Sequence, residues 1–205
     1  MKIPGGVRVE TDLRHYLQNR STLISPEINH VVADVNRFTS AVATEGFHKA
    51  LAEIGIDLEL RADRPFIEIC DAMIEHHVRF VPKAERQLVA KSLFEAYVYF
   101  AGPQHVFEPA SRTRLIRSLQ RRGAKSFAAL FLSLHLFNVI SMHIRDDVSA
   151  RIHNVKSFER YMLNVEAKCR DVVRRAVEIP TEQLDERWAA AVRHNIEAQL
   201  LGRTT

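Results

Sequence analysis

Residues 124–179 contain neither glycine nor proline, and this feature constrains the fold more than any other in the chain. Both residue types are scarce throughout, with seven of each among 205 residues, and they fall where helices are expected to begin or end. Because the uninterrupted run is long for one helix of a globular protein, we expect a break near residues 153–156. The pattern predicts an all-α protein.

Apolar side chains recur every three or four residues through most of the sequence, which is the period of an amphipathic helix. Helix starts are predicted at Pro26, Pro65, Pro82 and Pro180, and helix ends at Gly55, Gly102, Gly123 and Gly202, with a further possible break at Gly46. We therefore predict a single domain over residues 1–205, an orthogonal or antiparallel bundle of about seven or eight helices. Residues 1–10 are expected to form an extended N-terminal arm.

Residues 127–152 are predicted to form the buried central helix of this bundle. In the segment 127–144, 13 of 18 residues are apolar, and the five polar ones scatter around the helix instead of forming a stripe. A membrane span needs about 20 predominantly apolar residues. We therefore favour a helix buried inside a soluble protein over a membrane span, and expect no membrane partner.

Two short segments, 7–10 and 56–61, alternate apolar and polar residues, which is the period of a half-buried strand. They either pair with each other as a minor two-stranded element or form an arm and a linker. The two cysteines, Cys70 and Cys169, have no paired spacing, so they indicate neither a disulfide framework nor a zinc motif. Together with the lack of a signal-peptide pattern at the N-terminus, this indicates a cytoplasmic protein.

The positive charge of the chain is concentrated in residues 112–125, which hold six basic side chains and no acidic one. Residues 1–111 have a net charge of −3 and residues 126–205 a net charge of +1. The basic side chains are Arg112, Arg114, Arg117, Arg121, Arg122 and Lys125. Such clustering costs stability unless an acidic surface offsets it, so helix 111–125 is predicted to be a docking face.

An acidic protein is the partner that we favour for this face, and nucleic acid is the alternative. A recognition helix needs polar side chains to read bases, but the helix after Gly123 begins with core-type residues, Phe127 to Phe131. No aromatic residues interleave with the arginines to stack on single-stranded bases. A basic face that pairs with acids of the same molecule, such as Glu108, is a third interpretation.

His77 falls in the middle of the apolar face of the helix that Pro65 begins, beside Cys70 and Met73. A neutral imidazole in that position needs a hydrogen-bond partner or a ligand. The short run from His77 to Pro82 resembles the proximal histidine and helix corner of the globins, and that resemblance implies haem ligation by His77. We favour a hydrogen-bonded core histidine, with a haem- or metal-binding sensor as the alternative function.

No enzyme motif is present: the sequence lacks a glycine-rich phosphate loop, a Gly-x-Ser-x-Gly elbow and a His-Glu-x-x-His pair. His143 and Asp147 are spaced to share one helix face and could supply two metal ligands. A small helical enzyme with a pocket near His135 and His143 is a further alternative. The function predicted from sequence is a non-enzymatic interaction or regulatory subunit, for which no cofactor is expected.

Overall fold

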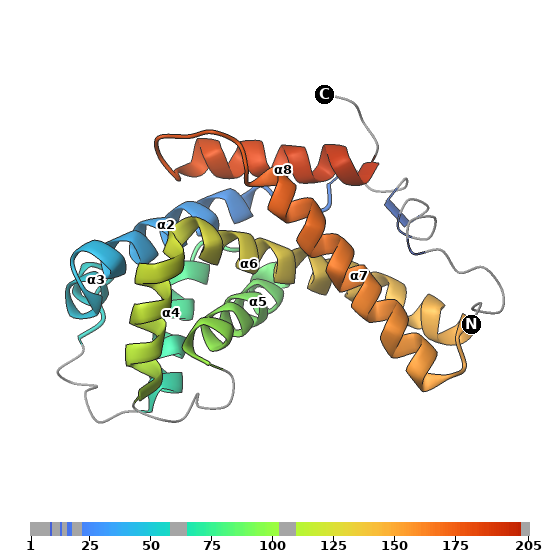
Figure 1. Cartoon of the computed structure of the whole chain (residues 1–205), viewed down its shortest axis with the longest axis horizontal. Helices are drawn as coiled ribbons and strands as arrows, with labels where there is room; N and C mark the ends of the chain where they lie inside the picture. Colours follow the sequence, from blue (N-terminus) through green and yellow to red (C-terminus); the bar gives the residue numbers. More distant parts are fainter. Residues whose placement is uncertain are drawn as a thin grey trace.

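The computed structural model describes residues 9, 13, 16, 17, 22–57, 65–102 and 110–201 of the chain, and within them it is entirely helical. Seven helices are defined in these ranges: α2 (Glu27–Thr44), α3 (Phe47–Glu53), α4 (Phe66–Val78), α5 (Lys83–Ala101), α6 (Ala110–Arg151), α7 (Val155–Ala176) and α8 (Glu186–Leu201). The predicted all-α bundle is confirmed (Figure 1).

Most predicted helix boundaries are found within a residue or two, but the helix start predicted at Pro180 is wrong. Helix α7 ends at Ala176 and α8 begins only at Glu186, because the side chain of Asp185 accepts hydrogen bonds from the amides of Arg187 and Trp188 and so caps the helix there. Pro26, Pro65 and Pro82 each stand immediately before the first helical residue of α2, α4 and α5. The long glycine-free run is broken between Arg151 and Val155, where the Asn154 side chain accepts a hydrogen bond from the Ser157 amide and so caps α7.

Helix α6 consists of two helical segments that meet at Gly123, where the backbone has φ 77° and ψ 164°. Residues other than glycine rarely adopt this conformation, so the predicted helix end at Gly123 is correct, and the second segment follows it directly. The second segment carries the core residues Phe127, Phe131 and Leu136, all fully buried. Helix α6 as a whole packs against α2, α5 and α7, and the burial of its second segment agrees with the predicted central helix of the bundle.

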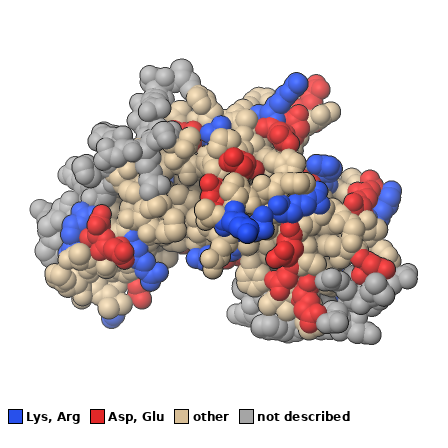
Figure 2. All heavy atoms as spheres, turned by 180° about the vertical axis from the view of Figure 1, so that it is seen from behind, with Lys and Arg blue, Asp and Glu red and all other residues tan. Residues whose placement is uncertain are grey.

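One continuous apolar core contains residues of all seven helices. Helix α8 lies along α2, and α2 also contacts α3, α4 and α6. The end of α6 and the start of α7 form a helical hairpin that extends away from the other helices (Figure 1). Across the face in Figure 2, basic and acidic side chains are interspersed over the surface.

Among the described helices, only α6 is long and apolar enough to cross a membrane by length and composition. Most of the apolar stretch of α6 is buried inside the protein, as expected for the core helix of a bundle. The predicted strand segments, 7–10 and 56–61, and the predicted arm lie mainly outside the described residues. Of those that are described, Val9 is helical and neither Ile56 nor Asp57 belongs to a strand.

Candidate functional site

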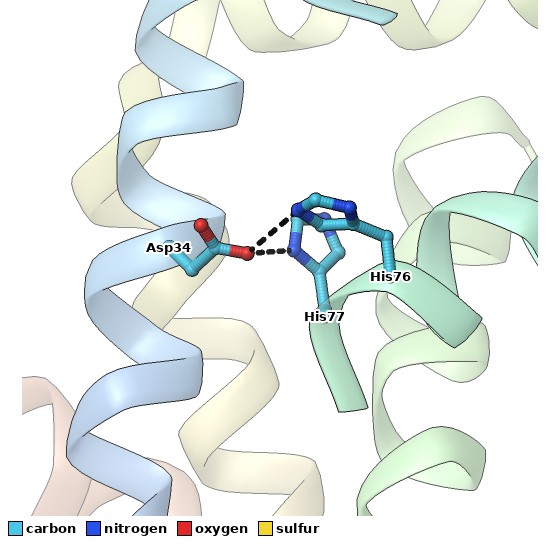
Figure 3. A group of neighbouring side chains, drawn as sticks. All are labelled: Asp34, His76 and His77. Atoms are coloured by element: carbon cyan, nitrogen blue, oxygen red, sulfur yellow. Dashed lines mark hydrogen bonds and ion pairs between the residues drawn. The ribbon is translucent and has the colours of Figure 1, made fainter. Parts of the chain in front are cut away.

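Three helices bring a carboxylate, two imidazoles and a phenol together inside the bundle. Asp34 comes from the middle of α2, His76 and His77 from the last turn of α4, and Tyr97 from α5. Asp34, His77 and Tyr97 are buried, and His76 exposes 12% of its side-chain surface. Figure 3 shows both imidazole rings directed at the Asp34 carboxylate.

His77 has a partner on each ring nitrogen. Its Nδ1 lies 2.8 Å from Oδ2 of Asp34, and its Nε2 lies 3.1 Å from the Tyr97 hydroxyl. In the neutral ring, Nδ1–H donates to the carboxylate while Nε2 accepts from the phenol, so every group is satisfied. This confirms the prediction of a buried, hydrogen-bonded histidine on the apolar face of α4. Haem ligation by His77 would require one of these contacts to break.

His76 occupies the outer side of the cluster. Its Nε2 lies 3.5 Å from Oδ2 of Asp34, the same oxygen that contacts His77. Its Nδ1 accepts a hydrogen bond of 2.7 Å from Nη1 of Arg79, an exposed side chain. Burial, and then the positive charge of Arg79, lower the pKa of His76, so its ring favours the neutral form.

The Asp34 carboxylate is kept ionised by its neighbours. Burial by itself would raise its pKa, but the hydrogen bond with His77 and the electrostatic attraction of the His77 and His76 imidazoles and of the Arg37 guanidinium together lower it. The Arg37 guanidinium lies 3.4 Å from Oδ1, the oxygen that faces away from the histidines. Oδ2 is therefore an anionic oxygen placed between two imidazoles.

The Asp34, His76 and His77 side chains each offer one ligand atom, and these three atoms all lie within 4.8 Å of one another. In a tetrahedral zinc site with bonds of 2.0–2.1 Å, neighbouring ligand atoms are about 3.3 Å apart. The two distances from Oδ2, 2.8 and 3.5 Å, lie on either side of that value. Two imidazoles and one carboxylate are a common ligand set for divalent transition metals.

A shallow cleft of about 530 Å³ connects His76 with the surface. Its polar lining comes from one face of α4, where Glu68, Asp71 and Glu75 precede His76 at helical spacing. Carboxylates along such a path attract cations and repel anions. The cleft therefore has the charge that a cation would need to approach the cluster.

Tyr97 can hold His77 in either tautomer. Its hydroxyl can donate to a bare Nε2, or accept from Nε2–H when the lone pair of Nδ1 is used to bind a metal ion. Burial raises the pKa of Tyr97 well above its usual value, so the phenol keeps its proton. It is therefore positioned to orient the ring of His77 while staying neutral.

Comparison with protein-family models, with curated proteins and with solved structures gives no match for this chain. Its function has to be argued from the geometry alone.

The basic side chains of the segment 112–125 do not all lie on one free surface. The guanidinium of Arg122 stacks on Tyr99 and Phe100 of α5, 5.4 Å from each ring centre, and Arg114 packs beside Gly102. Arg112 and Arg114 each have further contacts. Arg117, Arg121 and Lys125 form no ion pair with any described residue, and the first two are exposed.

The remaining predicted residues lie apart from the cluster. His135 is buried and stacks on Phe131, while the ring of His143 stacks on Tyr16. In the described part of the chain, Asp34, His76 and His77 are the only group of three or more close potential metal ligands. His143 and Asp147 thus lack a third ligand there. Both cysteines are buried, which raises the pKa of each thiol, that of Cys169 to about 12.

Sequence reasoning identified His77 but missed Asp34, His76 and Tyr97 as its neighbours. The one available signal was Asp34 itself, an acidic residue between the apolar residues Val32 and Val35 of α2. A charged residue at the edge of a buried helix face requires a partner. The pattern does not say on which helix that partner lies.

Proposed function

We propose that this protein is a metal-responsive helical regulatory protein that binds one divalent transition-metal ion, of the Zn²⁺ type, through Asp34, His76 and His77. The proposal rests on one observation, which is the mutual approach of three ligand atoms from two helices to within 4.8 Å. The buried phenol of Tyr97 and the acidic cleft beside His76 support it.

Metal binding at this position would join α2 to α4. Asp34 now contacts both His77 and His76 directly. With a metal bound, all three side chains would instead bind the same ion. His76 would have to give up its hydrogen bond from Arg79, since a ring that binds metal through Nε2 carries its proton on Nδ1. Binding is therefore coupled to the release of the Arg79 side chain.

Calorimetric titration of the metal-free protein with Zn²⁺, and the visible spectrum after titration with Co²⁺, test the proposal. We expect one ion per chain and the intense absorption of tetrahedral cobalt. His76→Gln, which removes one of the three ligands, should weaken binding by at least the roughly 10- to 100-fold that is lost when a residue that only orients a ligand is changed, whereas His48→Gln, which removes an exposed histidine of α3, should leave it unchanged. The same weak affinity in the wild type and in His76→Gln would contradict the proposal.

A second candidate function, docking of an acidic protein, is favoured by Arg117 and Arg121, which are exposed on α6 and form no ion pair with the rest of the described chain. Two labelled probes, a poly-glutamate peptide and a DNA duplex, separate the two kinds of partner. We expect the peptide to bind and Arg117→Glu with Arg121→Glu to abolish its binding. Binding of the duplex alone would replace the acidic protein by nucleic acid, and binding of neither probe would remove this candidate.

A further inference from the structure

A groove separate from the candidate metal centre runs between α5, the second half of α6 and α7. Its volume is about 450 Å³. Apolar side chains, Phe137 from α6 and Phe158, Met162 and Leu163 from α7, form much of its wall. The groove lies at the base of the helical hairpin of α6 and α7, which projects from the body of the molecule (Figure 1).

The apolar surface extends beyond the groove onto the hairpin. Of the five large hydrophobic side chains that are exposed in the described part of the protein, three belong to this hairpin: Met142, Val155 and Leu163. Leu163 lines the groove and is 63% exposed. Met142 lies one turn from both Asn138 and Arg145, which line the groove, and Val155 lies one turn from Phe158. Exposed apolar side chains gathered in this way indicate an interaction surface.

The floor of the groove is closed by hydrogen bonds within the protein. The amide of Asn138 donates to Ser92 (3.1 Å) and to Glu95 (3.0 Å), and its carbonyl oxygen accepts from Lys91 (3.1 Å). The side-chain amide of Asn138 therefore has its partners already, whereas the hydroxyl of Ser141, which also lines the groove, is buried without a hydrogen-bond partner among the described residues. What the groove offers to an occupant is mainly its apolar wall and the charges at its rim.

Two rim charges of opposite sign, Arg145 on α6 and Glu159 on α7, are exposed and form no ion pair with any described residue. In an interface with twofold symmetry, every contact occurs twice. If one residue of the first copy contacts a second residue of the other copy, the second residue of the first copy also contacts the first residue of the other copy. One copy's Arg145 can therefore face the second copy's Glu159, and the reverse, with the apolar side chains covered between them. The groove is complementary in charge to itself.

We propose that the hairpin of α6 and α7 forms a symmetric dimer interface, in which each groove is covered by the hairpin of a second copy of this chain. The exposed Leu163 and Val155 lie at its centre and the two pairs of Arg145 with Glu159 at its edge. This interface is independent of metal binding at Asp34, His76 and His77.

Sedimentation velocity over a range of concentrations tests the dimer in the full chain. We expect the wild type to dimerise and Leu163→Asp to be a monomer with an unchanged far-UV circular dichroism spectrum. Arg145→Glu and Glu159→Arg should each raise the dimer dissociation constant by ~10-fold or more, because each places like charges together. The double reversal should restore dimerisation. Phe80→Asp, at an exposed apolar residue outside the hairpin, should have no effect.

Three results would overturn this proposal: a wild type that is monomeric at all concentrations, a dimer that Leu163→Asp leaves intact, or a double charge reversal that fails to restore association. A monomer that binds the dye 1-anilinonaphthalene-8-sulfonate in the groove, and loses it on Leu163→Asp, would instead assign the groove to a small amphipathic anion.

Discussion

A single carboxylate oxygen, Oδ2 of Asp34, serves both histidines of the candidate metal centre. The two imidazoles are not equivalent, because His77 is held inside by Tyr97 whereas His76 is held from outside by Arg79. His77 is held rigidly, because its partner Tyr97 is buried. His76 can change its orientation more easily, because its partner Arg79 is exposed. The site is therefore open to a ligand from the side of His76.

Arg79→Ala is expected to strengthen Zn²⁺ binding. The change removes a donor that occupies Nδ1 of His76 and a positive charge beside the incoming ion. Because Arg79 is exposed and screened by solvent, we expect a gain of about two- to fivefold in affinity, measured by calorimetry. Arg86→Ala is the matched control, since the side chain of Arg86 donates its hydrogen bonds to backbone carbonyls, those of Arg79 and Val81, and not to His76. Weaker binding in Arg79→Ala would mean that Arg79 positions His76 instead of competing for it.

His135→Leu is expected to reduce the loss of folding stability at acidic pH. Burial lowers the pKa of His135 to about 4, from 6.5 in the unfolded chain. Between these two pKa values the histidine is protonated in the unfolded chain but neutral in the folded protein. The free energy of unfolding therefore decreases as the pH falls through this range, by about 3 kcal/mol in total. The leucine variant should lose this part of the pH dependence, measured by urea unfolding at pH 7 and pH 4. His48→Gln, at an exposed position, should retain it.

Residue-scale prediction from the sequence succeeded where helical periodicity determines the answer. The burial of His77, Cys70 and Cys169 follows from their spacing relative to apolar neighbours on the same helix. The contacts of His77 with Asp34 and Tyr97 join residues that are 43 and 20 positions apart. These contacts depend on how α2, α4 and α5 pack, and periodicity along one helix carries no information about that.

At the scale of elements, most helix ends were predicted well because they are local, the exception being the start predicted at Pro180, since α8 begins at Glu186. Pro26, Pro65 and Pro82 restrict the backbone wherever they occur, and the break between α6 and α7 follows from length. The basic segment was predicted less completely. Its charge could be counted from the sequence, but the packing of Arg122 on two rings of α5 and of Arg114 beside Gly102 could not. Arginine stems and guanidinium planes pack on apolar surface as readily as they meet anions.

Gly123→Ala tests the junction within α6. An added Cβ would meet no atom within 4 Å, so any cost comes from the backbone, which has φ 77° and ψ 164°. Conformations of this kind cost a residue other than glycine about 1–3 kcal/mol. We expect the free energy of unfolding to fall by that amount, measured in urea. Gln120→Ala, at an exposed position one turn earlier, should leave stability within about 0.5 kcal/mol of the wild type. Equal stability of the two variants would show that the junction can become a regular helix.

At the scale of the whole molecule, the continuous core has a thermodynamic consequence. Residues of all seven described helices belong to one apolar cluster, from Leu13 to Ile196. Helix α8 contributes Trp188, which is 3% exposed, and it packs on α2 and α7. Because α2 and α7 both contact α6, loss of α8 would expose apolar surface on the helices that cover the central one. No described helix has a core of its own.

We therefore expect the chain to unfold in urea in one cooperative transition. Trp188, the single tryptophan, reports on α8 by its fluorescence, whereas the far-UV circular dichroism reports on all helices. The two signals should have the same midpoint, as a two-state transition requires. The measurement is best made with Leu163→Asp, because dissociation of a dimer would make the midpoint depend on protein concentration. An earlier transition at Trp188 would show that α8 is a separate folding unit, held to the bundle only by its contacts with α2 and α7.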